Sequence, residues 1–427
     1  MTTSDLVGLR IKTVRRQRGL SQAQLAHPEL SDSYVSLIES GKRTPTPAVL
    51  ELLAQKLDCS LSYLINGVTA EQMEDIELAL GYARLALENG EVKEARTRFA
   101  ELLENNNLTG LTTLRQDTEF GLALAHEACG DLDEAISILL KLRDQELSTE
   151  RRIEVAMVLC RAYRDSERLT EAVQVGEQML AGNARLPWTD PLVELAATVL
   201  GAYMLRGDLL RARQFAAELL NAADALGTPR SIVAANWNAS SVAYATGHNE
   251  EALLFAERAL AVLLETGQPR AVARMRTALL QRRLRASPSE AASVRHALRA
   301  AVGEHEQTST SLIDRARVHV ELANAEYMTG DYDKAVEHAK SAIELVPEFG
   351  HVLGAEANLL LSRVYAAVGR ADEAAGHAAS VRDWLMPLPD TRRSASTWYA
   401  TAETMEQLGD SDGAVEAYQR ALACVGL

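Results

Sequence analysis

The 427-residue sequence predicts an all-α fold. Alanine, leucine and glutamate dominate, and runs rich in Val, Ile and Thr that would indicate strands are missing. Short helical segments with capping residues and terminal glycines fill the first 66 residues. After them, one turn-and-alanine motif recurs nine times at a spacing of about 40 residues. The chain is therefore expected to hold a small helical domain followed by an array of helical hairpins.

Composition bounds the class of protein. An apolar fraction of 47% and a charged fraction of 24% are ordinary for a soluble globular protein. The four cysteines are scattered without CxxC spacing, which favours reduced, buried thiols over disulfides or zinc. We expect no metal and no cofactor. The longest apolar run, residues 192–205, contains Glu194 and is too short to span a bilayer, and no signal peptide is evident, so a cytoplasmic location without membrane contact is expected.

Charge is distributed unevenly along the chain. Residues 1–66 carry a balance of +2, whereas the remainder carries −17. Because an acidic surface repels phosphate, any nucleic acid is expected to bind at the N-terminal end.

Five helices are predicted in residues 1–66. Each is delimited by residues that cap or break helices. The first helix ends at Gly19. The second is capped by Ser21 and broken by His27-Pro28, and the third is capped by Ser31 and ended by Gly41. The fourth follows Pro45 and Pro47, and the fifth is residues 61–65.

The second and third helices, joined by a tight turn, carry a recognisable pattern. It reads R-G-L-S-Q-x-x-L-A at 18–26, S-x-S-Y-V-S-x-I-E-S-G-K-R-x-P at 31–45 and L-x-x-L-I-N-G at 61–67. This pattern resembles the XRE (lambda/434 repressor-like) helix-turn-helix family over the whole segment. The resemblance implies that the third helix enters the major groove of double-stranded DNA.

The resemblance also implies a set of DNA-binding residues. Base-facing positions lie on the third helix, phosphate-gripping positions flank it, and Arg15 and Glu39 match an ion pair that ties the first helix to the third. The expected DNA-binding residues are Gln22, Ser31, Asp32, Ser33, Tyr34, Ser36, Leu37, Lys42 and Arg43.

Two residues depart from the family pattern. Leu37 stands where a polar base reader is common, and Asp32 brings negative charge to the groove. Asp32 either accepts a hydrogen bond from a cytosine amino group or simply favours the positive end of its helix. The docking mode is therefore predicted more firmly than the individual base contacts.

A short linker, residues 67–72, is expected between the domain of residues 1–66 and the array of residues 73–427. Thr69 and Gln72 form a predicted capping box that starts the next helix. A linker this short predicts mechanical coupling between the two parts.

The array is predicted from nine copies of a turn followed by an alanine, as in TGDYDKA. The small alanine lets the second helix of each hairpin lie close to the first. The anchor alanines are Ala95, Ala135, Ala172, Ala212, Ala252, Ala291, Ala335, Ala374 and Ala414. The motif resembles tetratricopeptide (TPR) repeats, most fully over 322–347 and down to Pro347, although the spacing exceeds the usual ~34 residues. Nine hairpins imply a right-handed α-solenoid with a groove lined by the first helices.

The groove residues are predicted from the TPR register. In such repeats the inner face falls about 18, 15, 14, 11 and 8 residues before the anchor alanine. Applied to the central repeats, this rule gives asparagine, arginine and aromatic residues, which suit the backbone and carboxylate of an extended peptide. The expected ligand-binding residues are Arg161, Arg164, Trp237, Asn238, Ser241, Tyr244, Arg276, Arg317 and Asn324. The alternative is that they are ordinary hydrated polar residues, and for Trp237 that it packs in the core.

Patterns for catalysis are absent from the sequence. It has no Walker loop, no GxSxG, no HExxH and no GxGxxG after a strand, and its nine histidines are dispersed. An enzyme is therefore not expected.

The full architecture resembles the peptide-sensing RRNPP-type regulators of Gram-positive bacteria. That resemblance implies a homodimeric transcription regulator in which a short signalling peptide of quorum-sensing type binds the groove and alters DNA binding. Two alternatives stay open: an interaction protein whose groove binds a partner protein, and a regulator that senses a small metabolite. The operator sequence, the ligand, the sign of regulation and the dimer interface are not predicted.

Overall fold

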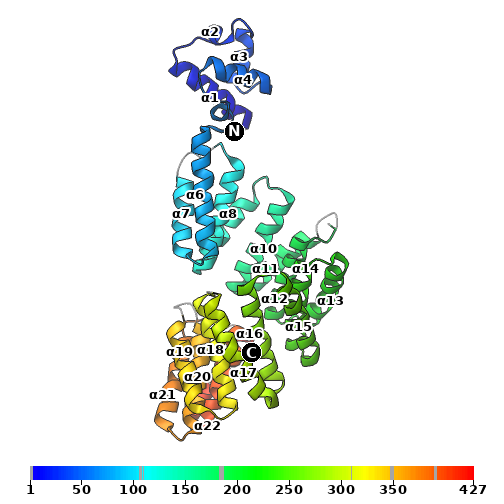
Figure 1. The fold of residues 1–427 in the computed structure, drawn as a ribbon, viewed down its shortest axis with the longest axis vertical. Helices are drawn as coiled ribbons and strands as arrows, with labels where there is room; N and C mark the ends of the chain where they lie inside the picture. Colours follow the sequence, from blue (N-terminus) through cyan, green and yellow to red (C-terminus); the bar gives the residue numbers. More distant parts are fainter. Residues whose placement is uncertain are drawn as a thin grey trace. The chain divides into compact units, whose positions relative to one another are not determined.

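The computed structural model describes residues 3–104, 108, 110–181, 187–308, 310–346, 351–388 and 392–427. Over these ranges the chain is helical and contains no strand, as predicted. It divides into two compact units, Met1–Leu147 and Ser148–Leu427 (Figure 1).

The first unit begins with five short helices, which we call the head. The predicted caps Ser21 and Ser31 each accept a hydrogen bond from a backbone N–H of the helix they precede, and Ser60 does the same for the fifth helix. The helices are α1 (Thr3–Gln17), α2 (Gln22–Ala26), α3 (Asp32–Glu39), α4 (Pro47–Lys56) and α5 (Leu61–Asn66).

The head has its own apolar core. Ile11 of α1, Val35 of α3 and Leu53 of α4 are fully buried in one cluster. Gly8 lets α1 cross α3 closely, because an added Cβ would collide with the backbone carbonyl of Ile38. This crossing holds α3 in place and leaves its opposite face free.

The head is joined directly to the first hairpin. Thr69 and Gln72 form the predicted capping box, and helix α6 begins at Ala70, so the connection is shorter than the predicted linker of 67–72. Val68 in the connection is fully buried against a cluster that includes Leu108 and Leu111. The compact unit extends to Leu147, well past this connection.

Arg10 fastens the same junction. Its Nη1 donates to the carbonyl oxygens of Leu64 (3.2 Å) and Ile65 (2.5 Å) at the end of α5. A Cβ at Gly110, before α8, would meet this guanidinium and the carbonyl oxygen of Asn66. The head therefore packs against the first hairpins within one unit.

The remaining helices of the described chain form nine antiparallel hairpins, as predicted, because each odd-numbered helix packs against the even-numbered helix before it. The first unit contains two hairpins: α6 (Ala70–Glu88) with α7 (Val92–Glu104), and α8 (Thr112–Cys129) with α9 (Leu132–Arg143). The second unit contains seven: α10 (Thr149–Asp165) with α11 (Leu169–Leu180), α12 (Asp190–Arg206) with α13 (Leu209–Leu226), α14 (Pro229–Ala245) with α15 (Asn249–Glu265), α16 (Pro269–Ala286) with α17 (Ala291–Gln307), α18 (Leu312–Met328) with α19 (Tyr332–Leu345), α20 (His351–Ala367) with α21 (Ala371–Leu385), and α22 (Arg392–Gln407) with α23 (Ser411–Ala423).

The anchor alanines behave as predicted. All nine are buried, with at most 4% of their surface exposed. Most of the turns before them contain a glycine with positive φ, such as Gly330 (φ 81°), and Glu167 (φ 60°) takes this conformation in a turn that lacks glycine. The sixth turn differs, because the 3-10 helix η2 (Pro288–Glu290) replaces the glycine. Pro347 lies outside the described residues.

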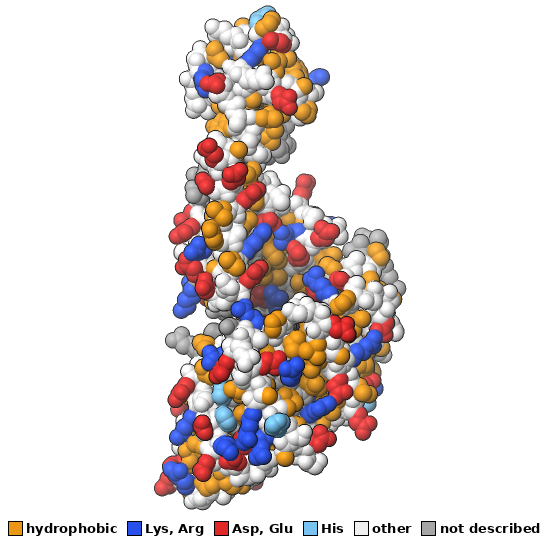
Figure 2. All heavy atoms as spheres, viewed as in Figure 1, with side chains coloured by type: hydrophobic (Ala, Val, Ile, Leu, Met, Phe, Trp, Pro, Cys, Tyr) orange, Lys and Arg blue, Asp and Glu red, His pale blue; other side chains and the backbone are white. Residues whose placement is uncertain are grey.

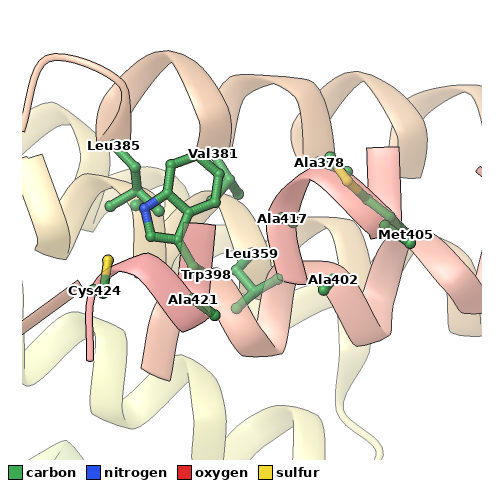
Figure 3. Close-up of a cluster of buried hydrophobic side chains, with 12 residues drawn as sticks. Leu359, Ala378, Val381, Leu385, Trp398, Ala402, Met405, Ala417, Ala421 and Cys424 are labelled. Atoms are coloured by element: carbon green, nitrogen blue, oxygen red, sulfur yellow. The ribbon is translucent and has the colours of Figure 1, made fainter. Parts of the chain in front are cut away.

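The last two hairpins share an apolar cluster in the second unit (Figure 3). Trp398 of α22, 2% exposed, lies among Leu359 of α20 and Val381 and Leu385 of α21. This packing fixes α22 beside α20, and both helices contribute to the groove described below.

Three findings concern the cysteines, metal ligation and membrane crossing. All four cysteines are free; Cys160 and Cys424 are buried, whereas Cys59 and Cys129 are only half-buried. Among the described residues, no cluster of three or more His, Cys, Asp or Glu side chains is arranged to hold a metal ion. No helix in the described ranges combines the length and apolarity that crossing a membrane requires.

Candidate nucleic-acid interface and ligand groove

The exposed face of α3 presents the predicted base-facing residues together. Asp32, Ser33, Ser36 and Leu37 are all exposed, with Leu37 at 41%. Ser31 is occupied with capping, since its hydroxyl accepts from the N–H of Tyr34. The arrangement offers two hydroxyls, one carboxylate and one apolar side chain to a partner surface.

An ion pair holds α3 in this orientation. Arg15 of α1 contacts Glu39 with Nε 2.5 Å from Oε1 and Nη2 2.8 Å from Oε2, and only 2% of the Glu39 side chain is exposed. Gln22, predicted to grip phosphate, donates from Nε2 to Oε2 of Glu39 (2.8 Å). Burial raises the pKa of Glu39, but hydrogen bonds from Arg15 and Gln22 outweigh it and leave this pKa below its ordinary value.

Cations of the head are divided between internal pairs and the surface. Arg18 pairs with Asp58, and Lys56 pairs with Glu29. Lys42 and Arg43, beyond the end of α3, are exposed, and the Arg43 guanidinium lies 5.8 Å from the ring centroid of Tyr34. On the face drawn in Figure 2, acidic and basic side chains of the head are interspersed. The two cations beside α3 are therefore well placed for phosphate contacts.

A cavity of about 500 Å³ lies in the second unit. Its lining comes from α14, α16, α18, α20 and α22, which are the first helices of five successive hairpins, together with Pro288. This is the surface on which the sequence predicted the groove. We call it the groove cavity; its polar lining residues are Tyr244, Arg285, Glu321, Asn324, Glu356, Arg363, Ser396 and Thr397.

Glu321 is the most deeply placed acid of the groove cavity. It is 1% exposed and accepts a hydrogen bond from Gln281. Burial raises its pKa to about 7; the carboxylate of Glu356 adds to the rise, while Arg285 and Arg317 oppose it. The Nη1 of Arg317 lies 3.9 Å from Oε2 of Glu356. These two acids and two arginines therefore interact with one another through their charges.

The predicted ligand residues are placed at different distances from this cavity. Tyr244 and Asn324 line it, and Arg317 contacts Glu356, which lines it. Arg276 pairs with Glu304 of α17. Arg161 and Arg164 lie on α10, which contributes no described residue to the lining.

Two further predicted residues, Trp237 and Ser241, contact Arg282 of α16, and Asn238 bonds within its own helix. The Arg282 guanidinium stacks 4.2 Å from the Trp237 ring centroid, and its Nη2 donates to Oγ of Ser241 (2.7 Å). Asn238 donates back to the carbonyl of Ala234 (2.9 Å). Burial lowers the pKa of Arg282 to about 10, and no described carboxylate forms an ion pair with it.

A shift of register explains why Arg276 is not in the lining. Helices α14, α18 and α20 end seven residues before Ala252, Ala335 and Ala374, whereas α16 ends five residues before Ala291. The short 3-10 turn has removed two residues from this hairpin. Inner-face positions of α16 therefore move two residues towards the C-terminus and fall on Arg282 and Arg285.

Three of the other residues that sequence analysis missed follow the same register rule. Counting back 18 and 11 residues from Ala374 gives Glu356 and Arg363, and counting back 18 from Ala414 gives Ser396. All three line the groove cavity. The register rule thus holds in the last two hairpins, to which it had not been applied.

Comparison with known proteins identifies both parts of the chain. A helix-turn-helix family model matches residues 11–64, and a tetratricopeptide repeat model matches residues 316–349. The HTH-type transcriptional regulator PrpR of Mycobacterium tuberculosis is 37% identical over 70 residues, which are 16% of this chain and 14% of that protein. The immunity repressor protein of Bacillus phage phi105 is 38% identical over 72 residues, 17% of this chain and 50% of that protein. The chain therefore spans at most half the length of these two curated relatives.

A solved structure extends the likeness over the hairpins. The Rap protein complexed with Competence and Sporulation Factor aligns with a TM-score of 0.53 at 14% identity, covering 82% of this chain and 98% of that one. At this identity the likeness concerns the fold alone. The chain thus combines an XRE-type helix-turn-helix domain with a TPR-like helical array.

Proposed function

We propose that the chain is a sequence-specific, DNA-binding transcription regulator whose groove binds a short signalling peptide that alters DNA binding. The observation that carries the ligand part is the groove cavity, which spans the first helices of five successive hairpins. Its volume of about 500 Å³ lies within the range of small-ligand sites.

The DNA-binding part rests on the exposed face of α3. Ser33, Ser36 and Leu37 meet base edges in the major groove, while Lys42 and Arg43 hold flanking phosphates. The names of the curated relatives, a transcriptional regulator and an immunity repressor, agree with this role for the matched segment. Two heads of a homodimer reach half-sites about one helical turn, ~34 Å, or a multiple of it apart.

The chemistry of the cavity favours a peptide as ligand. Asn324 offers both a donor and an acceptor, which suits a peptide backbone whatever its side chains. Carboxylates and guanidinium groups lie in the same cavity, so both ends of a zwitterionic chain find partners there. The fold neighbour Rap is complexed with Competence and Sporulation Factor. A metabolite or a partner protein as ligand is an outcome that the experiment below separates.

The test is fluorescence anisotropy of the full chain on DNA from upstream of its own gene, with a shuffled duplex for comparison. Titrations are run at two salt concentrations, with and without the small-molecule fraction of spent culture medium, before and after protease treatment. We expect specific binding that shifts with the fraction and no longer shifts after proteolysis. A shift that survives proteolysis contradicts the peptide and favours a metabolite. Equal, weak affinity for both duplexes refutes the regulator and turns the search to protein partners.

A pair of variants separates the groove from the head. Asn324→Ala is expected to abolish the shift while leaving the affinity for DNA unchanged, because Asn324 lines the cavity of the second unit and the head belongs to the first. Gln419→Ala, at an exposed position of α23, is the matched control and should respond as the wild type does. Loss of DNA affinity in Asn324→Ala would assign this residue to structure instead of ligand binding.

A further inference from the structure

One guanidinium in the groove cavity lacks a counter-charge. Arg363 of α20 donates from Nε to Oγ1 of Thr404 (3.2 Å) and from Nη2 to the carbonyl oxygen of Ala400 (3.4 Å). Both acceptors are neutral and belong to α22. No carboxylate in the described part of the chain forms an ion pair with Arg363, although its side chain lines the cavity.

The two hydrogen bonds to α22 hold the guanidinium in place but use only part of its N–H donors. An arginine side chain carries five N–H donors in a planar fork. Two are used here, so the Nη1 group and the second N–H of Nη2 stay available. A fork held in this way loses little conformational freedom when it binds a planar acceptor.

The surroundings of Arg363 suit a single negative charge. Glu321 and Glu356 have Arg285 and Arg317 as their electrostatic partners. Arg363, in contrast, donates only to neutral acceptors among the described residues, Thr404 and the carbonyl of Ala400. A carboxylate matches both the charge and the bidentate geometry of the fork.

We propose that Arg363 binds a carboxylate of the groove ligand, in a cavity that Asn324 and the hydroxyls of Ser396 and Thr397 also line. The proposal rests on the proposed function, since it assigns a chemical group to the ligand of that groove. For a peptide, the carboxylate is the C-terminal one. The preference is therefore for a free C-terminus over a carboxamide.

The test uses two synthetic hexapeptide libraries without Asp or Glu, one with free C-termini and one amidated. Each is mixed with the full chain, unbound peptide is removed by gel filtration, and retained peptide is quantified by mass spectrometry. We expect free carboxylates to be retained ~10- to 100-fold better than amides, the range for hydrogen bonds to charged groups. Arg363→Gln should erase this ratio, and Arg363→Lys should retain part of it.

The control variant is Arg370→Gln, whose exposed side chain pairs with Glu373 outside the cavity. It should show the wild-type ratio. The ratio of free to amidated peptide separates loss of the carboxylate contact from loss of the hydrogen bonds between Arg363 and α22. A loosened α22 would lower the retention of both libraries alike and leave the ratio unchanged. Equal retention of both libraries by the wild type, or an unchanged ratio in Arg363→Gln, overturns the carboxylate site and leaves the peptide function standing. Retention of neither library overturns the peptide function and the carboxylate site together.

Discussion

Substitution of the buried acid Glu321 by glutamine is expected to stabilise the second unit, and increasingly so as pH rises. Glu321 is 1% exposed and its folded-state pKa is about 7, above an ordinary value of 4.5. The folded protein therefore favours the protonated carboxyl. The stability that this group contributes is fully present below pH 4.5 and is lost as pH rises through about 7.

The magnitude follows from the same two values. The span from 4.5 to about 7 corresponds to about 3 kcal/mol, at about 1.36 kcal/mol per pKa unit. Glutamine keeps the acceptor for Gln281 and never ionises, so Glu321→Gln escapes this cost. The variant should match the wild type near pH 5 and exceed its unfolding free energy by about 3 kcal/mol near pH 8.

Urea unfolding followed by tryptophan fluorescence measures this difference in the relevant unit. All four tryptophans, at positions 188, 237, 384 and 398, belong to the second unit, which also contains Glu321. The matched control is Glu373→Gln, an exposed acid paired with Arg370, which should show no growing gain between pH 5 and 8. A stability difference for Glu321→Gln that is independent of pH, or a variant less stable than the wild type near pH 8, would refute the reasoning.

Three further predictions concern the first unit. Glu39→Gln should destabilise the head by about 3 kcal/mol at neutral pH, because Arg15 is left buried without its partner. Thermal unfolding should show that this loss of stability shrinks as pH falls through the lowered pKa of Glu39. An unchanged melting temperature at neutral pH would contradict the prediction. Replacing Lys42 and Arg43 with alanine should weaken binding to all DNA sequences alike and reduce the salt slope by about 2, whereas a changed sequence preference in a binding titration would exclude phosphate contacts. Gly110→Ala should loosen the head from the first hairpin, because the added Cβ would lie 2.5 Å from a carbonyl oxygen at the end of α5. Amide hydrogen exchange at the start of α6 should then be faster than in the wild type. Unaltered exchange there would speak against the prediction.

The repeat architecture was predictable because its signals are local. An anchor alanine, a turn that reverses the chain and the capping residues act over a few positions, so they can be read from the sequence. Nine hairpins and nine buried alanines follow from them. The capping serines of the head were predictable for the same reason.

The lining of the groove cavity was predictable only where the hairpin kept its regular turn. Tyr244, Asn324 and Glu321 follow the register of their anchors, whereas the 3-10 turn before Ala291 moves the inner face of α16 by two residues. A count in sequence cannot detect such a shift, because the helix end that defines it depends on how the turn folds.

The sequence by itself determined the fold class, the helix-turn-helix pattern and the repeat register, since these depend on spacing along one chain. Only the tertiary structure decided which charges are compensated. Arg363 bonds to neutral groups of α22 about 40 residues away, and Glu321 owes its raised pKa to burial among helices from successive hairpins. Charge compensation is a property of neighbours in space, because the electrostatic energy of two groups depends on the distance between them and on their burial, not on their separation in sequence.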